Sequence, residues 1–450
     1  MHTKLKLLSL SSLLALSHFA QADWVDDAVL ASDAHVIQLR EHIHQHPELG
    51  NIEFETSKLV QKELKSYGIE VKTGYAKTGV IGILKGAKPG PVMAMRADMD
   101  ALPMAEKTGL AYASKAKALY QGKESPVMHA CGHDAHTAML LGAAKVLAEH
   151  KQELAGTVVF VFQPAEEGGA DIDNFAHPET IGARKMMSDG ALNNPKPEVM
   201  FGQHVMAGMR SGEYAYKAGA ALNSADGFEI KVTGKQVHGS MPWKGRDPIV
   251  AAASMITQAQ TLVSRRADIS KGMGVVSFGN IHAGTADNII PEEVTMGGTI
   301  RSNHPDVRNA LVDGLPEIIN NVAKANDVTV EVKQSAYAPV TMNEPKLTEV
   351  MVASLNKAAG GKTHLLPTNQ APSEDFAFYA EKIPSLYVFL GATPAGQDLN
   401  KAAPNHSPEF IVDNATLKTG VNGLVRMALD YPQYSEQVQA SWKAAQSPAK

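Results

Sequence analysis

Short apolar runs, rich in β-branched and aromatic residues, recur along this chain, and helical patterns separate some of them. The runs are Val80–Leu84, Val92–Met95, Thr157–Phe162, Val199–Phe201 and Ser385–Leu390. Their length and composition favour buried strands, although periodicity alone leaves a buried helix open. A clear helical pattern at His136–His150 lies between two of the runs. We therefore predict an α/β fold whose mixed, largely parallel sheet is flanked by helices.

The middle of the chain has a different pattern. Strand-like and helical segments follow one another there in the order β-α-β-β-α-β, which is typical of a ferredoxin-like sandwich. The segments are 227–233, 247–266, 274–280, 293–301, 306–326 and 328–335. We predict that residues 216–337 form an inserted α+β domain, while residues 23–215 and 338–450 together form the metal-binding domain. The polar tail from Gln437 onward is expected to fray.

The first residues have the pattern of a secretory signal peptide. Lys4 and Lys6 precede an apolar run, and Ala20-Gln21-Ala22 is a small-x-small cleavage pattern. Because the run is too short to cross a bilayer comfortably, we predict removal of residues 1–22 rather than a membrane anchor. No later segment has the apolar length of a membrane span. We expect a secreted protein of the periplasm.

Charge and cysteine content exclude several classes of protein. The formal net charge is -5, so nothing indicates nucleic acid or an acidic membrane surface as a partner. Cys131 is the only cysteine, which excludes an internal disulfide. A lone thiol in an exported protein is open to oxidation unless it is buried or bound to a metal. The residues around Cys131 therefore bear directly on function.

Polar side chains follow three of the apolar runs. Asp98 and Asp100 follow the second run, Glu166 and Glu167 the third, and His204 the fourth. Ligands bind outside the carboxyl ends of strands in open α/β sheets, so these side chains are expected to converge. A single charged residue at such a place would mean little, because chains often reach water there.

The motif HACGHDAH at residues 129–136 adds a thiol and an imidazole on a tight glycine turn. Thiolate and imidazole both bind borderline-soft divalent ions, so Cys131 and His133 are candidate ligands. Asp100 or Asp134 could orient a histidine ring. A buried structural thiol beside a histidine-rich helix start is the alternative. A structural zinc site would need further thiolates, so the mixed donors favour a catalytic metal site.

The adjacent carboxylates of Glu166 and Glu167 precede Gly168-Gly169, which permits close approach of the backbone. Adjacent carboxylates in a loop are usually only solvated charge. Beside a metal, one carboxylate can bind the ion while the other acts as a base. The metal lowers the pKa of a bound water to about 7, and the base can pass the proton on to a leaving amine.

Ten short motifs, in order over about residues 39–410, resemble the metal-dependent amidohydrolases related to aminoacylase and carboxypeptidases. The most similar branch contains hippurate hydrolase, N-acyl-amino-acid hydrolases and the plant indole-acetyl-amino-acid hydrolases. The motifs are LREHIHQHPELG, MRADMDALPM, HACGHDAHTAMLLGAA, FQPAEEGGA, GQHV, VHGSMPW, ADNIIPEE, GTIRS, SEDFAFY and NHSPEF. The resemblance covers nearly all of the chain that follows the predicted signal peptide.

This resemblance implies metal-dependent hydrolysis of the amide bond of N-acyl-amino acids by a two-metal centre. The implied ligands are Cys131, His133, Glu167, His204 and His406. Glu166 is the implied general base. The wider family has His-x-Asp where this chain has Asp98-Met99-Asp100, so we interpret Asp98 and Asp100 as supports of the catalytic centre. The mixed ligands admit zinc, manganese, cobalt or nickel.

The resemblance also implies a lid and dimerisation role for the inserted domain. His238 resembles a histidine that reaches an active site, commonly the partner subunit's, and stabilises the tetrahedral oxyanion. Asn288 and Arg301 resemble the groups that hold the substrate's carboxylate, although Arg301 could also be a strand-end surface charge. Residues 171–181 lengthen the run after Glu167 and are expected to lie at the mouth of the site. We expect a homodimer that acts on a small N-acyl-amino acid or short peptide.

Three other functions stay open. A periplasmic metallo-dipeptidase or carboxypeptidase of the same fold would need an acidic partner for the substrate's α-amino group, and the sequence identifies none. A protein that only binds metal or peptide would have no need of Glu166 beside a full ligand set. A serine hydrolase would carry a G-x-S-x-G motif, which is absent, and a catalytic Cys131 would act without metal.

Overall fold

The apolar runs form strands of an eight-stranded sheet with the order β1-β2-β6-β3-β7-β18-β8-β17. This computed structural model describes residues 23–446, so the predicted signal peptide lies outside the described residues. The central strands are parallel neighbours: β6 (Ala155–Gln163), β3 (Lys88–Asp98), β7 (Val199–Arg210) and β18 (Ser385–Thr393). The outer strands are β1 (Glu70–Tyr75), β2 (Gly79–Lys85), β8 (Tyr214–Tyr216) and β17 (Thr363–Leu365). The predicted α/β class with a largely parallel sheet is confirmed.

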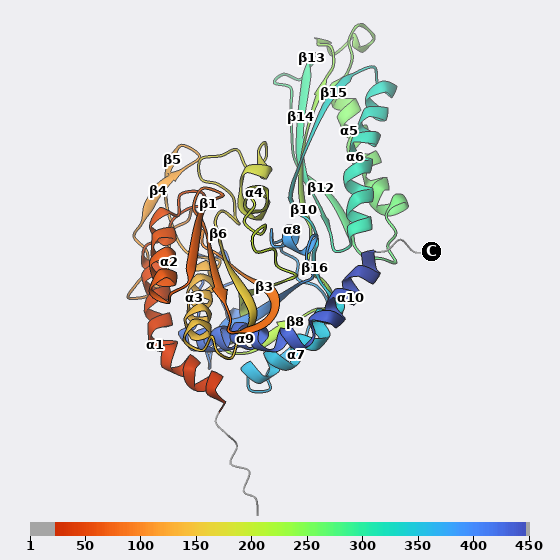
Figure 1. Cartoon of the computed structure of the whole chain (residues 1–450). Helices are drawn as coiled ribbons and strands as arrows, with labels where there is room; N and C mark the ends of the chain where they lie inside the picture. The colour runs from red at the N-terminus through yellow and green to blue at the C-terminus, as the bar shows by residue number, and fades with distance from the viewer. Residues whose placement is uncertain (1–22, 447–450) are drawn as a thin grey trace, which may run out of the picture.

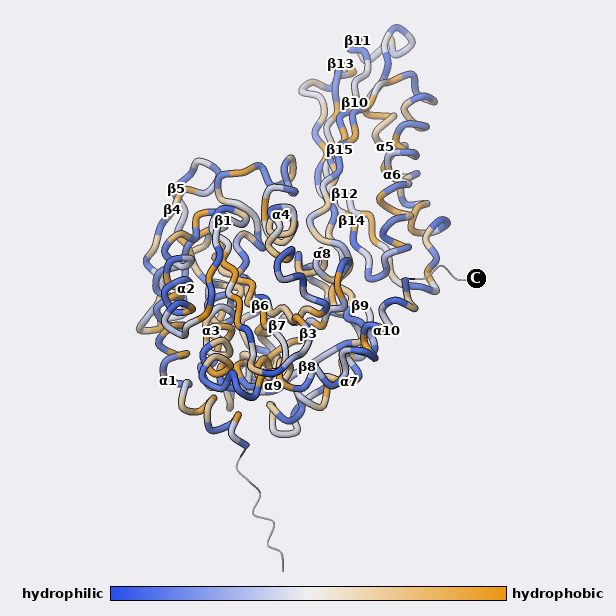
Figure 2. The backbone as a smooth tube through the Cα atoms, viewed as in Figure 1, coloured by the Kyte–Doolittle hydropathy of each residue, from blue (hydrophilic) through white to orange (hydrophobic). Residues whose placement is uncertain are grey.

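Helices cover both faces of this sheet, which explains why its strands are apolar on both sides (Figures 1 and 2). Met93 and Met95 of β3 face a core shared with the long helices, while Ala94 faces a second core with the short ones. The long helices are α1 (Trp24–Gln45), α2 (Phe54–Ser66), α3 (His133–Glu149), α7 (Pro345–Ala358) and α9 (Leu417–Asp430). The short helices are α4 (Gly182–Ser188) and α8 (Ala377–Ala380).

Helix α10 (Ser435–Gln446) corrects the expectation that the chain frays from Gln437. Val438 is fully buried, and the side-chain amide of Gln439 donates a hydrogen bond to the carbonyl oxygen of Glu198 at 2.8 Å. One apolar contact and a few side-chain hydrogen bonds are enough to dock this polar helix on the domain. Among the described residues, no helix combines the length and the apolar character needed to cross a membrane.

A four-stranded antiparallel sheet with the order β12-β14-β10-β15 forms a narrower unit that projects from the larger one (Figure 1). Its elements follow the predicted β-α-β-β-α-β order: β10 (Ala225–Thr233), α5 (Pro248–Thr261), β12 (Gly274–Ala283), β14 (Glu293–Ser302), α6 (Pro305–Ala325) and β15 (Thr329–Ala338). Phe228, Met255 and Leu311 belong to its separate hydrophobic core. The ferredoxin-like class is thus confirmed, while the domain limits 216 and 337 stay predictions.

Short strand pairs complete the two units. In the larger unit, β4 pairs with β5 and β9 with β16, while β11 and β13 pair at the far end of the narrower unit, away from the large sheet (Figures 1 and 2). Their bounds are β4 (Lys117–Tyr120), β5 (Lys123–Pro126), β9 (Gly219–Leu222), β11 (Val237–His238), β13 (Ile289–Ile290) and β16 (Thr341–Asn343).

Candidate active site

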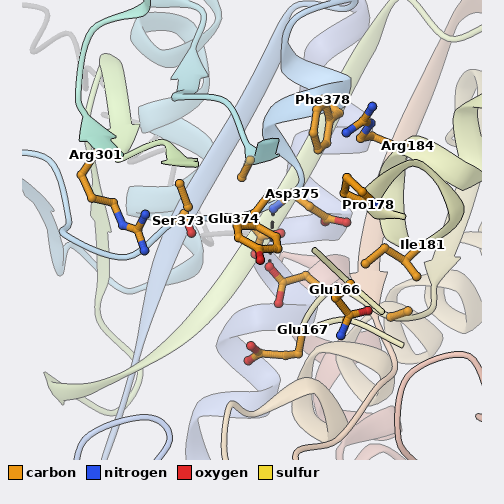
Figure 3. Close-up of a pocket in the computed structure, with 16 residues that line it drawn as sticks. Glu166, Glu167, Pro178, Ile181, Arg184, Arg301, Ser373, Glu374, Asp375 and Phe378 are labelled. Carbon is orange, nitrogen blue, oxygen red and sulfur yellow. Dashed lines mark hydrogen bonds between the residues drawn. The ribbon is translucent and has the colours of Figure 1, made fainter. Parts of the chain in front are cut away.

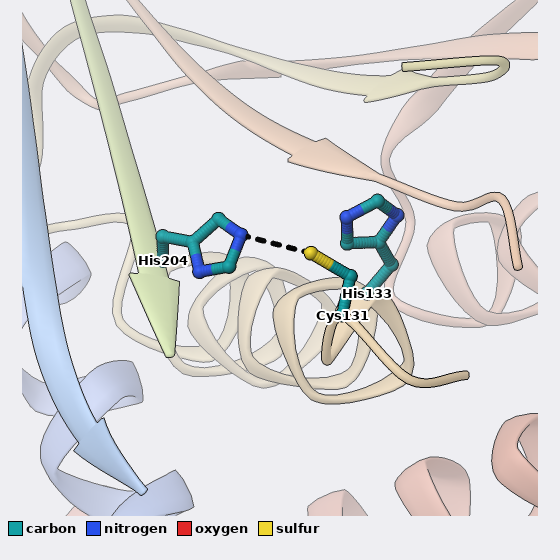
Figure 4. A group of neighbouring side chains, drawn as sticks. All are labelled: Cys131, His133 and His204. Carbon is teal, nitrogen blue, oxygen red and sulfur yellow. Dashed lines mark hydrogen bonds between the residues drawn. The ribbon is translucent and has the colours of Figure 1, made fainter. Parts of the chain in front are cut away.

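The structure brings all five predicted metal ligands together beside the carboxyl end of the large sheet. The Cys131 Sγ atom lies 3.3 Å from Nε2 of His204 and 3.3 Å from Nε2 of His406. His406 Nε2 lies 2.8 Å from a carboxylate oxygen of Glu167. His133 lies on the other side of the thiol from His204 (Figure 4).

These donors form two overlapping groups that share Cys131. The first contains His133 and His204, the second contains Glu167 and His406, and the donor atoms in each group lie within 4.8 Å of one another. Thiolate, imidazole and carboxylate are ligands of borderline divalent ions. A shared thiolate between two such groups fits a pair of neighbouring ions.

Hydrogen bonds leave one ring nitrogen of His133 and His204 available for a metal. The His133 Nδ1 atom lies 2.8 Å from the carbonyl oxygen of Asp100, to which it donates, and its buried Nε2 atom has no hydrogen-bond partner among the described residues. The His204 Nδ1 atom likewise lies 2.8 Å from the carbonyl oxygen of Val205, and its Nε2 atom faces Cys131. Backbone carbonyls that hold Nδ1–H in this way are typical of metal-binding histidines.

Nearby carboxylates raise the pKa of His133 and contribute to the raised pKa of Cys131. Burial lowers the pKa of His133, but the carboxylates of Asp98, Asp100 and Glu167 outweigh burial and raise this pKa to about 10. Burial, and then the charges of Glu167, Glu166 and Asp98, raise the pKa of the Cys131 thiol well above its ordinary value. A divalent cation in this place would replace the bound protons and stabilise the thiolate. The residues present therefore fit a metal centre.

Asp98 and Asp100 support this centre from behind. Asp98 accepts from His136 Nδ1 at 2.7 Å and from Arg96 Nη1 at 2.6 Å, so both of its oxygens are engaged. Asp100 accepts the backbone N–H of Glu167 at 2.9 Å through its side chain and binds His133 through its carbonyl. These contacts orient two ligands, which agrees with the supporting role interpreted from the sequence.

The turn that carries Glu166 and Glu167 is fixed by the segment before α2. The carboxylate of Glu53 accepts the backbone N–H of Ala165, which has a φ angle of 53°, at 2.8 Å. A Cβ atom on Gly50 would lie only 2.0 Å from the carbonyl oxygen of Gly168, which has a φ angle of 111°. Glycine is required at both positions because the two backbones touch and because L side chains rarely adopt this φ region.

The two adjacent carboxylates have opposite proton affinities. Burial, and then the charges of Glu374, Glu167 and Asp375, raise the pKa of Glu166 well above its ordinary value. Burial opposes ionisation of Glu167 too, but the hydrogen bond and charge of His406 hold its pKa below the ordinary value. Paired carboxylates with divergent pKa values commonly divide acid–base and electrostatic roles. Glu166 is thus suited to carry a proton, and Glu167 to bind a cation.

Two cavities meet at this carboxylate pair. One, of about 230 Å³, has Arg301, Arg184 and Tyr337 in its walls, and the other, of about 300 Å³, has the apolar side chains of Met206, Leu222 and Phe389. Residues that line both are Glu166, Glu167, Ser373 and Glu374. Figure 3 shows Arg301 and Glu166 on different sides of the first cavity.

The segment 171–181 lies at the first cavity, as the sequence led us to expect. Asn174, Pro178 and Ile181 line the cavity wall. Phe175 lies against Gly227 of β10, because a Cβ atom on that glycine would lie 3.1 Å from the phenyl ring. The segment therefore contacts the narrower unit as well as the site.

His238 and Asn288 do not reach the site of their own chain. They lie together at the far end of the narrower unit, where the N–H of Gly239 donates to the carbonyl of Asn288 at 2.7 Å. Neither residue lines either cavity, whereas Arg301 does. Of the three residues assigned to the lid, only Arg301 is therefore placed at this catalytic centre.

Comparison with known proteins agrees with this geometry. The model of "Peptidase family M20/M25/M40" matches residues 94–430, which is most of the chain. The chain belongs to this peptidase family. The resemblance interpreted from the ten motifs is thereby confirmed.

Three relatives of this M20 peptidase are named for different activities. It is 36% identical over 396 residues to an N-acetylcysteine deacetylase of Bacillus subtilis and 36% identical over 397 residues to a hippurate hydrolase of Campylobacter jejuni, each alignment covering 88% of this chain and 96% of the relative. It is also 36% identical over 399 residues to thermostable carboxypeptidase 1 of Saccharolobus solfataricus, covering 88% of this chain and 95% of that protein.

Two solved structures share the whole architecture of the M20 peptidase. A Bacillus subtilis protein described as a dinuclear metal binding peptidase has a TM-score of 0.72 and 33% identity, with 90% of this chain and 99% of that one covered. A protein of methicillin resistant Staphylococcus aureus described as an aminohydrolase has a TM-score of 0.81 and 32% identity, with 91% and 99% covered.

The sequence left the partners of Arg96 unassigned. This arginine, fully buried in β3 of the M20 peptidase, donates through Nη2 to Glu374 at 2.9 Å and to Asp375 at 2.9 Å. The backbone N–H of Asp375 in turn points to a carboxylate oxygen of Glu166 at 3.4 Å. An arginine inside an apolar strand, together with two carboxylates in the SEDFAFY motif, was the signal that could have revealed this network.

Proposed function

We propose that this M20 peptidase is a metal-dependent amidohydrolase that cleaves the amide bond of N-acyl-amino acids, releasing a carboxylic acid and an amino acid. The supporting observation is the position of the Glu166–Glu167 pair between a cavity lined by arginine and a cavity lined by apolar side chains. The names of the deacetylase and the hippurate hydrolase among its relatives support the same reaction class.

Two divalent ions would be held by Cys131, His133, Glu167, His204 and His406. The bound ions supply Lewis acidity, which polarises the amide carbonyl and makes a water molecule more acidic. Mixed sulfur, nitrogen and oxygen donors suit zinc, manganese, cobalt or nickel. Asp100 keeps the ligands His133 and Glu167 in place through hydrogen bonds, and Asp98 holds His136 behind them.

Glu166 is the general base and then the general acid. It accepts a proton from the attacking water, whose oxygen forms the new bond to the carbonyl carbon. As the C–N bond breaks, Glu166 delivers that proton to the leaving nitrogen. A pKa above the ordinary value makes Glu166 a stronger base towards the attacking water than an ordinary carboxylate.

The two cavities assign the two halves of the substrate. Arg301 binds the carboxylate of the amino acid with its planar guanidinium, and the acyl group lies against Met206, Leu222 and Phe389. The acyl cavity is mostly apolar, which matches an uncharged acyl chain or ring.

The carboxylates of the apolar cavity argue against a dipeptidase. A dipeptide would place its free α-ammonium group there and would need an acidic partner. Glu166 and Glu167 serve the reaction, and the third carboxylate, Glu374, already accepts hydrogen bonds from Arg96 at 2.9 Å and from Tyr387 at 2.5 Å. No other Asp or Glu of the described residues lines this cavity. An N-acyl-amino acid is therefore favoured over a dipeptide.

A homodimer through the inserted domain, and export to the periplasm, complete the proposal. The domain exposes apolar side chains, among them Trp243 at 73%, Val250 at 55% and Ile281 at 48% of their surface. Exposed apolar side chains on this domain are available for association with a second copy of the chain. The same domain carries His238, which lines neither cavity of its own chain and is free to act in a partner's. Export rests on the signal peptide pattern of residues 1–22.

The test uses protein reconstituted separately with zinc, manganese, cobalt and nickel. Initial rates on N-benzoyl-amino acids and on matching dipeptides are measured before and after EDTA. We expect N-benzoyl substrates to be cleaved faster and EDTA to abolish turnover. The Glu166→Gln variant should lose about 10²- to 10⁴-fold in kcat while its metal content stays near two ions.

Glu179→Gln is the matched control, because Glu179 is an exposed glutamate in the same connection between β6 and β7. It should keep full activity. Turnover that survives EDTA or the Glu166→Gln change would contradict the proposed mechanism. A faster rate on dipeptides would contradict the assignment of the substrate.

A further inference from the structure

A second arginine, Arg184, lines the same cavity as Arg301 and has no role in the reaction described so far. Arg184 lies on the short helix α4, directly after the segment 171–181. Its Nη1 atom donates to the carbonyl oxygen of Ala336 in β15 at 3.2 Å, and its guanidinium carbon lies 5.2 Å from the centre of the Phe378 ring. The carbonyl and the aromatic ring hold the guanidinium at the cavity wall (Figure 3).

Neither of these two arginines is engaged in an ion pair within residues 23–446. Their hydrogen bonds go to Ala336, Thr299 and Ile300. Of the carboxylates that line the cavity, Glu374 and Asp375 bind Arg96, while Glu166 and Glu167 belong to the catalytic centre. Two partly buried guanidinium groups without an ion-pair partner favour an anionic ligand over a neutral one.

The walls of the cavity match the three groups on the α-carbon of an amino acid. The amide nitrogen must lie beside Glu166, which protonates it. The α-carboxylate then points to Arg301, and the side chain points to the remaining wall, formed by Arg184 with Phe378 and Ile181 (Figure 3). Phe378 and Ile181 offer contact to methylene groups, and Arg184 offers a planar pair of donors to whatever ends the side chain.

We propose that Arg184 binds a carboxylate in the side chain of the substrate's amino acid, so that the enzyme prefers N-acyl-glutamate or N-acyl-aspartate over neutral N-acyl-amino acids. This inference rests on the proposed function, because it extends the binding of an N-acyl-amino acid at the same centre. Arg184 is then a specificity-determining residue rather than a part of the reaction.

The competing interpretation is structural. Through Ala336 and Phe378, Arg184 links α4 to the inserted domain and to the segment that carries Glu374 and Asp375. If this link were the whole role of Arg184, replacing the residue would lower kcat/KM for all substrates alike. If Arg184 instead binds an acidic side chain, the replacement would lower kcat/KM only for substrates that carry the second carboxylate.

The experiment compares kcat/KM for N-benzoyl-glutamate, N-benzoyl-glutamine and N-benzoyl-leucine with the metal-loaded enzyme. We expect the wild type to prefer glutamate over glutamine by about 10- to 100-fold, as for a charge-assisted hydrogen-bond pair. Arg184→Gln should remove this preference, mainly through KM, and leave the glutamine substrate within about twofold. Arg184→Lys should keep part of the preference, because the charge remains while the planar fork is lost.

Lys185→Gln is the matched control, since Lys185 is the next cation on α4 and pairs with Asp189 outside the cavity. It should leave the preference unchanged. Equal rates of the wild type on glutamate and glutamine substrates, or an equal loss on all three substrates in Arg184→Gln, would overturn the inference. If Arg184→Gln folds poorly by circular dichroism, the wild-type ratio and the Arg184→Lys ratio decide. Failure of the proposed function is distinct, because no N-benzoyl-amino acid would then be cleaved.

Discussion

The backbone N–H of Val205 donates a hydrogen bond to Nε2 of His136 at 2.9 Å. The other ring nitrogen of His136 donates to Asp98 at 2.7 Å, so neither nitrogen is available to a metal. The ring lies next to the rings of His133 and His204 and joins α3 to β3 and β7. Of the neighbouring histidines, His136 therefore serves the fold while His133 and His204 face the metal centre.

Replacement of His136 should separate stability from metal binding. His136→Ala leaves the Val205 N–H and one oxygen of Asp98 without a partner, which we expect to lower the free energy of unfolding by about 1–3 kcal/mol. At saturating metal the variant should still bind two ions. His133→Ala should lose at least one ion. Denaturant unfolding and elemental analysis measure the two effects, and equal metal loss in both variants would contradict the distinction.

Arg96 should be one of the costliest positions in the chain to change. Its buried guanidinium contacts Asp98, Glu374 and Asp375, so Arg96→Met would leave three carboxylates in the interior without their cation. We expect a loss of about 3–5 kcal/mol in unfolding free energy, measured in denaturant. The control is Arg246→Met, which breaks an exposed pair with Asp327 and should cost less than about 1 kcal/mol. Similar losses in both would refute the role given to burial.

Much of the fold was predictable because strands and helices leave local patterns. Runs such as Thr157–Phe162 are apolar on both faces, and the structure shows helices on both sides of that strand. Glu166 and Glu167 were predictable as site residues because they follow such a strand directly. His204 was found for a partly wrong reason. It lies within β7, which continues to Arg210, rather than after the end of the strand.

The rest depends on contacts between segments that are far apart in the chain. Nothing near Arg96 in the sequence indicates Glu374, because a buried ion pair needs only proximity in the folded chain. Arg184 lies in a stretch whose sequence pattern is not characteristic of a helix or a strand. Only its contacts with Phe378 and Ala336 in the folded chain indicate a role for it. For His238 and Asn288, the folded single chain does not complete the prediction, because neither residue lines either cavity of its own chain.

The buried Glu53 should make stability depend on pH. Burial, and then the charge of Asp100, raise the pKa of Glu53 to about 8, from the ordinary value of 4.5. Between about pH 4.5 and about pH 8, the folded state holds a proton that the unfolded state has released. The contribution of Glu53 to the free energy of unfolding is therefore complete below about pH 4.5 and is lost as the pH rises to about 8. The slope is at most about 1.4 kcal/mol per pH unit.

Glu53→Gln should remove this dependence. A glutamine can still accept the Ala165 N–H, and the Thr78 hydroxyl can turn to accept its amide. Relative to the wild type, the variant should therefore gain stability as the pH rises from 5 to 8.5. The measurement is denaturant unfolding of protein stripped of metal, because a nearby cation would favour the carboxylate. A difference between variant and wild type that is constant with pH would show that Glu53 is ionised throughout.

His238 gives the sharpest test of the proposed dimer. It lies at the far end of the inserted domain, where the N–H and hydroxyl of Ser240 contact its Nδ1 atom at 3.1 and 2.8 Å, and where it lines neither cavity. If it stabilises the oxyanion in the partner's site, each active site takes Glu166 from one chain and His238 from the other. As pure homodimers, the His238→Ala and Glu166→Gln variants should each lose about 10²-fold or more in kcat.

Mixing the two inactive variants should then restore activity. A dimer of one His238→Ala chain and one Glu166→Gln chain has one site with both changes and one site with neither. Random exchange makes half of the dimers mixed, so about a quarter of wild-type activity should return after subunits are dissociated and reassembled. Mixing each variant with itself is the control. If His238 acted within its own chain, every site in the mixture would lack one group, and no activity would return at any ratio.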